Sequence, residues 1–321
     1  LGDVYKRQRD GVADAVRRAP AAVPRQAGRP GQDGAAAPAR GPGGAADAVR
    51  AAERAYADAL GDATVEVVDE LADHHFRSKP AGTRNAKALQ KELRRLKRDL
   101  PEPHPDGSVF VRFDEGRLDL CRCALTGPAD TPFFGGPFVF DVYFPQDYPA
   151  VPPLVHLTTT GSGTVRFNPN LYADGKVCLS LLGTWHAADA SQKWNADTST
   201  LTQVLLSIAG QILVKEPYFN EPAYERVRGT PEGDATSERV NGDLRNKTRT
   251  CAVVDHLKRP PRGLEEVARE HLRRLRGPLL DAAKRDLGPA ASRATKRAAG
   301  ALVSQLALAF GADDAPEPPT K

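Results

Sequence analysis

Residues 137–144 carry the pattern that most limits how this chain can fold. From Phe138 to Phe144 every second residue is large and apolar, while Asp141 and Tyr143 stand among the residues between them. A period of two indicates a β-strand with one face buried against a core. One strand cannot bury such a face alone, so the pattern demands partner strands and a second layer of structure.

Three further strand-like runs accompany this one, and turns such as Asp114-Glu-Gly116 and Gly135-Gly136 separate them. Strands joined by short turns pair antiparallel, because a parallel pair needs a long crossover. We therefore expect a four-stranded antiparallel sheet. Its strands are predicted at Ser108–Phe113, Arg117–Thr126, Pro137–Phe144 and Leu154–Thr159.

Helical patterns precede and follow the strands. Leucines recur at helical spacing in Asn85–Leu100, with Asn85 in the N-cap position and Pro101 directly after the helix. Thr202–Val214 is rich in Val, Leu and Ile and predicts a buried central helix. Helices that flank a run of strands indicate the α+β class. Further helices are predicted at Asp47–Leu60, Val65–His75, Glu238–Lys258, Gly263–Arg276 and Ala290–Phe310.

Composition predicts how the chain is divided. The first 44 residues are rich in Ala, Arg, Gly and Pro, with too few large apolar side chains to offset the entropy of ordering. Residues 1–8 resemble a translated library adapter, and the absence of Met predicts a fragment of a longer protein. The predicted segments are a disordered stretch at 1–44, a short helical flank at 45–84, the main domain at 85–275, a basic helical extension at 276–310 and a disordered tail at 311–321.

Several classes of protein are disfavoured. No apolar run reaches the roughly 18 residues that a spanning helix needs. The four cysteines are too few and scattered for a disulfide framework or a zinc site, and Cys121 and Cys123 are expected to point to opposite faces of their strand. A reducing compartment follows, the cytoplasm or alternatively the nucleus. His74 and His75 lack further ligands at useful spacing. The basic residues of 256–310 are interpreted as solvated helix faces rather than a nucleic-acid site.

The stretch Asn168–Cys178 carries the chemistry. It places one thiol, Cys178, eight residues after the side-chain amide of Asn170. A thiol can hold an acyl group as a thioester, and a nearby amide N–H can stabilise the oxyanion that forms when the thioester is attacked. An inert, half-buried cysteine is the alternative for a thiol outside such a pattern.

Several motifs fall in one order along the chain, namely Gly127–Gly136, Asp147-Tyr-Pro149, Asn168-Pro-Asn170, Gly175–Leu179 and Trp194. Together they resemble the ubiquitin-conjugating (E2) enzyme family. Over roughly residues 85–275, the resemblance implies the E2 (UBC) fold, with an N-terminal helix, a four-stranded antiparallel sheet, a central helix and C-terminal helices. Three segments, Val177–Trp185, Ile212-Leu-Val214 and Glu216–Glu221, are similar to the large hybrid E2/E3 enzymes of the Apollon/BRUCE and E2-O type.

This resemblance implies roles for individual residues. Cys178 would take ubiquitin from the activating enzyme (E1), in an ATP-dependent pathway, and present it to a substrate lysine without metal or cofactor. Asn170 would structure the loop and donate to the oxyanion. Asn168 departs from the family's usual His at a mainly structural position. Glu216 would orient and help deprotonate the lysine, or is simply a solvated loop carboxylate. Tyr218 and Asn220 are secondary candidates.

The resemblance also bears on partners. Lys87, Lys91, Arg94 and Arg95 of the first helix would dock the activating enzyme, or form an ordinary solvated face. Docking of ordinary RING-type E3 partners is not expected, because the family's bulky aromatic is replaced by Ala150. Asn195-Ala-Asp197 replaces a second family loop, and a polar insertion, His186–Lys193, precedes it.

Two other functions remain open at this point. An E2-like module could bind ubiquitin without catalysis, although such variants typically lack the cysteine. The chain could also conjugate a ubiquitin-like modifier, which the residues alone do not exclude.

Overall fold

The computed structural model describes residues 42–81, 86–185, 192–289 and 291–311. The position predicted as N-cap of the first helix, Asn85, lies outside these residues, as do the stretches at 1–41 and 312–321. None of the described helices is both long and apolar enough to cross a membrane.

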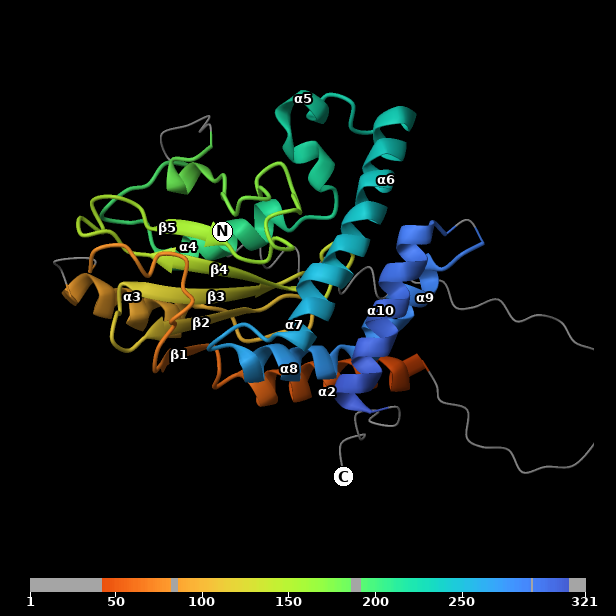
Figure 1. Ribbon diagram of the computed structural model, residues 1–321, viewed down its shortest axis with the longest axis horizontal. Coiled ribbons are helices and arrows are strands. Elements are labelled where there is room, and N and C mark those ends of the chain that lie inside the picture. The colour runs from red at the N-terminus through yellow and green to blue at the C-terminus, as the bar shows by residue number, and fades with distance from the viewer. Residues whose placement is uncertain (1–41, 82–85, 186–191, 290, 312–321) are drawn as a thin grey trace, which may run out of the picture.

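Five strands form one sheet, in the order of the sequence (Figure 1). The four predicted strands are present as a continuous antiparallel meander, which confirms that part of the prediction. An additional strand, β1, pairs in parallel with β2 at the sheet edge. The strands are β1 (Val65–Val68), β2 (Val109–Asp114), β3 (Leu120–Thr126), β4 (Pro137–Tyr143) and β5 (Leu154–Leu157).

The prediction of a helix at Val65–His75 is wrong. Its first residues are Val-Glu-Val-Val, and this run forms β1 instead. Branching at Cβ restricts the side-chain rotamers in a helix and suits the pleated surface of a sheet. Residues 69–80 continue as turns that cover the sheet. The flank at 45–84 is therefore partly strand, and it is joined to the main sheet.

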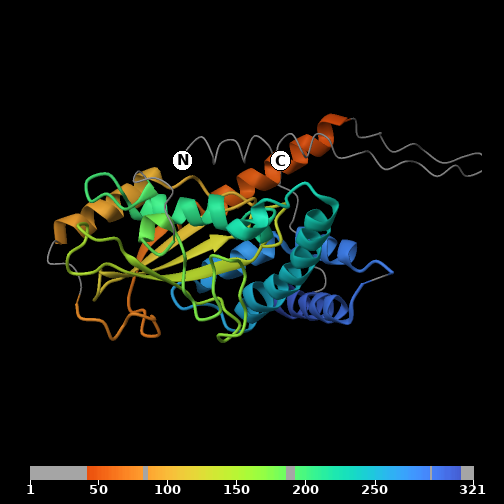
Figure 2. The same ribbon diagram turned by 90° about the horizontal axis from the view of Figure 1, so that it is seen from above.

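One face of the sheet packs against two helices, α3 (Ala86–Asp99) and α4 (Leu201–Ser207). Figure 2 shows α4 running along this face. A π-helical turn, Ile208–Ile212, continues α4 to the end of the predicted central helix. Cys121 and Cys123 both lie in this core, which contradicts the expectation of opposite faces. Residues two apart on a strand share a face, and both thiols therefore point inward.

The opposite face is covered by segments from both ends of the described chain. α2 (Pro42–Leu60) and α8 (Glu265–Arg274) lie side by side beneath the sheet (Figure 1). The Tyr56 hydroxyl lies 2.7 Å from Nδ1 of His271, whose Nε2 donates to the Gly135 carbonyl at 3.1 Å. Because a carbonyl only accepts, Nε2 carries the proton and Nδ1 accepts from Tyr56. Burial lowers the pKa of His271 to about 4, so the ring is neutral at physiological pH.

A row of polar residues crosses this covered face through the middle of all five strands. Each residue stands directly opposite the next, and the order is Glu66, Arg112, Arg122, Asp141 and His156. The Arg122 guanidinium donates twice to the buried Asp141 carboxylate, at 2.7 and 3.0 Å. Arg112 donates to the carbonyls of Ala63 and Gly263, one from each covering segment. Buried charges are tolerated only with such partners, so the row requires both segments to be in place.

The C-terminal helices build a second core around the π-helical segment Thr248–Val254, in which Leu272, Leu279 and Phe310 pack together. The domain boundary predicted after residue 275 falls inside this cluster. One helix of the group, α9, lies in the predicted helical extension at 276–310 but was not predicted as a separate helix. The helices are α6 (Pro231–Lys247), α7 (Asp255–Lys258), α8, α9 (Arg276–Asp286) and α10 (Arg293–Phe310).

The contribution of the flank at 45–84 to stability can be tested through Tyr56. This residue is 1% exposed and lies among apolar residues of the sheet and α8. Tyr56→Ala should lower the free energy of unfolding by about 3–5 kcal/mol, because it leaves a cavity and removes the partner of His271. Urea denaturation followed by circular dichroism measures this. Tyr224→Ala is the matched control at a 44% exposed side chain and should change stability by less than about 1 kcal/mol. Equal effects of the two variants would show that the flank is not part of the folded unit.

Candidate active site

The residues that carry the predicted chemistry lie on a short β-hairpin, residues 170–178. Leu171 and Val177 face each other across its two arms. Gly175 closes the turn with φ +85°, in the left-handed region, and a side chain there would collide with His156. The sequence forms this hairpin because Gly is strain-free at that angle and because Leu171 and Val177 enter the core.

The hairpin places Asn170 directly opposite Cys178. The Cys178 amide donates to the Asn170 carbonyl at 2.9 Å, and Nδ2 of Asn170 donates to the Cys178 carbonyl at 3.0 Å. Oδ1 of Asn170 in turn accepts a 3.4 Å hydrogen bond from Asn220. These contacts fix which end of the amide faces the cysteine. Since Nδ2 has two hydrogens, one remains for a further acceptor.

Asn168 stabilises the loop from beneath, as expected of a structural position. Its Oδ1 accepts from the Asn170 amide at 2.7 Å, and its Nδ2 donates to the Ile212 carbonyl at 2.9 Å. The side chain is buried and links the hairpin to the end of the central helix. The side-chain amide of Asn168 thus donates one hydrogen bond and accepts another at this position.

The Cys178 thiol is not activated in advance. The residue is 2% exposed, and burial raises the pKa of the thiol, because the thiolate is poorly solvated there. The positive charges of Lys176 and Arg166 act in the opposite direction, and Asp174 adds to the effect of burial. At neutral pH the group is therefore a thiol rather than a thiolate.

The other predicted residues occupy the segment after the central helix. Asn220 is joined to the site through Asn170 and also donates to the Gln211 carbonyl at 2.8 Å. Glu216 lies just before the short 3₁₀ helix Pro217–Asn220 and is half-buried. Tyr218 lies in a neighbouring groove, stacked on Tyr224 with ring centroids 4.6 Å apart.

Glu221 was missed by the sequence reasoning. It directly follows Asn220 and lines the same groove as Tyr218, together with Asn168 and Pro169 of the active-site loop. Glu216 is absent from that lining. An acidic residue next to Asn220 is visible in the sequence, but only the fold shows which of the two carboxylates faces the groove.

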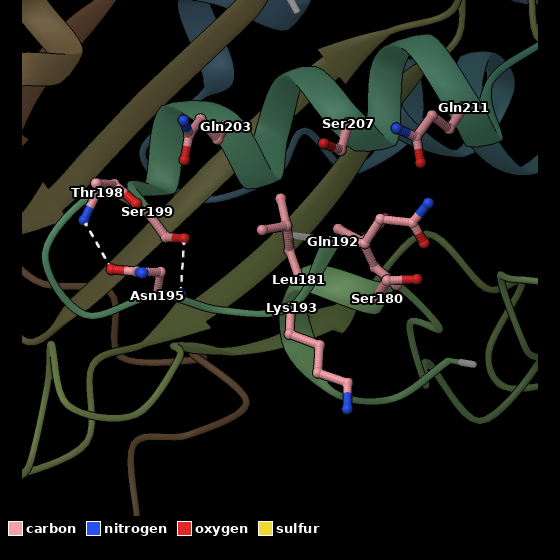
Figure 3. A pocket seen from close by; sticks show the side chains of 11 residues that line it. Ser180, Leu181, Gln192, Lys193, Asn195, Thr198, Ser199, Gln203, Ser207 and Gln211 are labelled. Atoms are coloured by element: carbon pink, nitrogen blue, oxygen red, sulfur yellow. Dashed lines mark hydrogen bonds between the residues drawn. The ribbon is translucent and has the colours of Figure 1, made fainter. Parts of the chain in front are cut away.

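An open groove of about 670 Å³ is lined by Leu179, the residue directly after Cys178, and by residues of the central helix (Figure 3). One wall is the 3₁₀ turn that follows Cys178, with Ser180 and Leu181. The other wall is the central helix, whose residues Gln203, Ser207 and Gln211 recur every four positions and therefore face the groove together. The groove is therefore polar on the helix side.

The four cations predicted to dock the activating enzyme lie on α3, and three of them face away from its packed side. Lys87, Lys91 and Arg94 are exposed. Arg95 is half-buried, with its guanidinium 3.9 Å from the Glu92 carboxylate. Glu92 is buried and accepts from the Leu201 amide and the Tyr148 hydroxyl, so Arg95 faces the α3–α4 contact more than solvent.

The loop that was expected to lack a docking aromatic presents Ala150 and Val151, and Val151 is 38% exposed. Trp194 lies behind this loop and donates from Nε1 to the Pro149 carbonyl at 2.7 Å. Asn195 forms a turn by accepting from the Asp197 amide. The inserted loop His186–Lys193 lies outside the described residues except for its last two.

The two histidines that raised the question of a metal site have other contacts. The buried His74 donates from Nε2 to the Cys121 carbonyl, and His75 stacks on His156 with ring centroids 3.4 Å apart. No group of three or more His, Cys, Asp or Glu residues in the described ranges is arranged to hold a metal ion.

The fold and the hairpin agree with a known family. Residues 88–235 match the family model described as ubiquitin-conjugating enzyme. The chain therefore contains a domain of the E2 family, as the motifs indicated.

Among curated relatives, several are large proteins. The chain is 53% identical over 186 residues to the human protein named "Dual E2 ubiquitin-conjugating enzyme/E3 ubiquitin-protein ligase BIRC6", a match that covers 58% of this chain and 4% of that protein. It is 47% identical over 186 residues to "Probable ubiquitin-conjugating enzyme protein 17" of Caenorhabditis elegans, covering 58% and 25% respectively. "Putative ubiquitin-conjugating enzyme E2 38" of Arabidopsis thaliana is 41% identical over 212 residues, covering 64% and 61%. The similarity to the hybrid E2/E3 type is thus confirmed, and the chain spans less than two thirds of each of these relatives.

The raised pKa of Cys178 predicts slow alkylation. At pH 7.5 the thiol should react with iodoacetamide roughly threefold or more slowly than a free peptide of residues 170–178, because less of it is thiolate and little of it is exposed. Mass spectrometry of the Cys178 peptide measures this separately from Cys251. A rate equal to that of the free peptide would contradict the burial of the thiol.

Proposed function

We propose that this chain is the conjugating part of a ubiquitin-transfer enzyme, which carries ubiquitin as a thioester on Cys178 and transfers it to a substrate lysine. The observation that supports it most directly is the hairpin pairing of Cys178 with Asn170, whose amide is held in a fixed orientation by Asn220. The names of the relatives support ubiquitin rather than another modifier.

The first step is an exchange of thioesters. The Cys178 sulfur attacks the carbonyl carbon of the ubiquitin thioester on the activating enzyme, the C–S bond to that enzyme breaks, and the thiol proton passes to solvent or to the departing thiolate. One thioester replaces another, so the step is nearly isoenergetic. The extended C-terminal tail of the bound ubiquitin would lie in the groove between Ser180 and the central helix.

The second step is attack by a lysine amine on the Cys178 thioester. Negative charge develops on the carbonyl oxygen, and the second hydrogen of Asn170 Nδ2 can donate to it. The lysine must lose a proton, since its free pKa is about 10.4. Glu216 is proposed to orient and deprotonate it, and Glu221, which lines the adjacent groove with Tyr218, is the other carboxylate available.

Docking of the activating enzyme is proposed at α3. Lys87, Lys91 and Arg94 offer exposed positive charge, while Arg95 contributes less because it faces Glu92. Two alternatives remain for the function, namely ubiquitin binding without catalysis and conjugation of a ubiquitin-like modifier. The presence of Cys178 in the hairpin argues against the first.

A charging assay tests the proposal. With activating enzyme, ATP and ubiquitin, the protein should form an adduct that reductant removes, and Cys178→Ala should abolish it. Cys251→Ala is the matched control at the half-buried cysteine outside the site and should charge normally. Lack of any adduct on the folded wild-type protein would overturn the proposal, and loading of a different modifier in its place would favour the second alternative.

Substitution of Asn170 should affect the second step and not the first. Asn170→Ala should still be charged, but discharge of the thioester to lysine should slow about 10²- to 10³-fold, the usual effect of removing one oxyanion donor. Single-turnover discharge to free lysine measures this, with Glu216→Gln and Glu221→Gln compared in the same assay. Normal discharge by Asn170→Ala would leave this residue a purely structural role.

We also propose that ordinary RING partners do not stimulate this enzyme. A bulky aromatic seated in a pocket carries much of such binding, and Ala150 cannot replace it. Addition of a generic RING domain should leave the discharge rate within about twofold of its basal value, whereas a standard E2 in the same assay should be stimulated. Comparable stimulation of both enzymes would refute the idea.

A further inference from the structure

Tyr172 stands at the centre of a cationic cluster on the active-site hairpin. The Arg166 guanidinium carbon lies 4.2 Å from the centroid of its ring, and the Lys176 ammonium lies 5.6 Å from it. Both distances are within the range in which a cation is attracted by an aromatic ring. Arg166 is further fixed by donating to the carbonyls of Asn168 and Pro169.

The register of the hairpin directs this cluster to the side of the cysteine. Leu171 faces Val177, so Tyr172 faces Lys176 just as Asn170 faces Cys178. Residues two apart on one arm share a face and lie about 7 Å apart along it. Tyr172 and Lys176 therefore share the face of Asn170 and Cys178, while Leu171 and Val177 point into the core.

The charges that act on the thiol come from three side chains. Lys176 and Arg166 favour the thiolate, and Asp174, in the turn of the hairpin, disfavours it. Lys176 and Asp174 are both exposed on the hairpin. Two cations and one carboxylate thus leave a net positive charge beside the Cys178 sulfur, which burial keeps protonated.

We propose that Tyr172 is a platform that holds Arg166 and Lys176 beside Cys178, so that their charges stabilise the thiolate both as nucleophile and as leaving group. The three are positioning residues, because none of them needs to touch ubiquitin or the substrate. A thiol that stays protonated at rest resists unwanted alkylation and oxidation, yet it must bear negative charge when a thioester forms or breaks. Cations held at fixed positions lower the free energy of the negatively charged sulfur in these steps, but they do not ionise the resting thiol. The inference rests on the proposed function for its purpose, although the electrostatic effect can be measured without ubiquitin.

The test is the pH dependence of Cys178 alkylation by iodoacetamide, followed on the Cys178 peptide by mass spectrometry in the full chain. Lys176→Ala should move the midpoint of the profile to higher pH and slow alkylation below it about two- to threefold, as expected for loss of one charge several ångströms away. Asp174→Asn should move the midpoint in the opposite direction. Both shifts should shrink in 1 M salt, which screens exposed charges.

Matched variants separate charge from structure. Lys176→Arg keeps the charge and should behave as wild type, although it cannot accept ubiquitin itself. Tyr172→Phe keeps the ring and should also behave as wild type, whereas Tyr172→Leu should resemble Lys176→Ala. Thermal unfolding checks that each variant is folded.

One result would overturn the proposal, namely a midpoint that stays the same in Lys176→Ala and Asp174→Asn. If the midpoint is unchanged and a separate discharge assay shows a raised KM for acceptor protein in Lys176→Ala, Lys176 would be assigned to substrate docking instead. Because the alkylation assay contains no ubiquitin, its failure is distinct from failure of the charging assay.

Discussion

The buried pair of Arg122 and Asp141 is the constraint on which the arrangement of this domain depends. Burying two charges in the middle of a sheet lowers stability unless each carboxylate oxygen and each guanidinium N–H forms a hydrogen bond. The remaining contacts come from outside the strands, where Arg122 also reaches Asp73 and the Arg262 carbonyl, and Asp141 accepts from the His75 amide. These partners lie before α3 and after α7. The sheet can therefore keep its central charges only if both flanks fold back over it.

The active site depends on a simpler rule, the period of two along a strand. In nine residues the hairpin alternates side chains that anchor it with the side chains proposed to carry the chemistry. Leu171 and Val177 fix it to the core, and this leaves Asn170 and Cys178 facing each other on the other face of the hairpin. Asn168 and Asn220 then hold the amide in one orientation. The relative positions of Asn170 and Cys178 are thus set by a few backbone pairings on a rigid core, and not by contacts of the sulfur itself.

Much of the fold and the centre of the site could be predicted from sequence, because both rest on local patterns. The four antiparallel strands follow from alternation and turns, and the Asn170–Cys178 spacing is itself a hairpin length. What failed depends on tertiary context. Strand β1 is too short to show its period and exists only because β2 offers an edge to it. The roles proposed for Glu221 and Tyr172 could not be inferred from sequence, since only the register and the groove show which way they face.

The row of polar residues through the sheet does not stop at β5. His156, its last member, bridges to Lys176 of the active-site hairpin, and its ring stacks on His75 of the flank. The covering flank and the hairpin that carries the cysteine thus meet on the same histidine. Segments that lie before and after a catalytic motif are often treated as attachments that can be trimmed when a domain is isolated. In this protein the trimmed piece would include one side of the support beneath the hairpin, so the shortest fragment that keeps this support has to begin well upstream of α3.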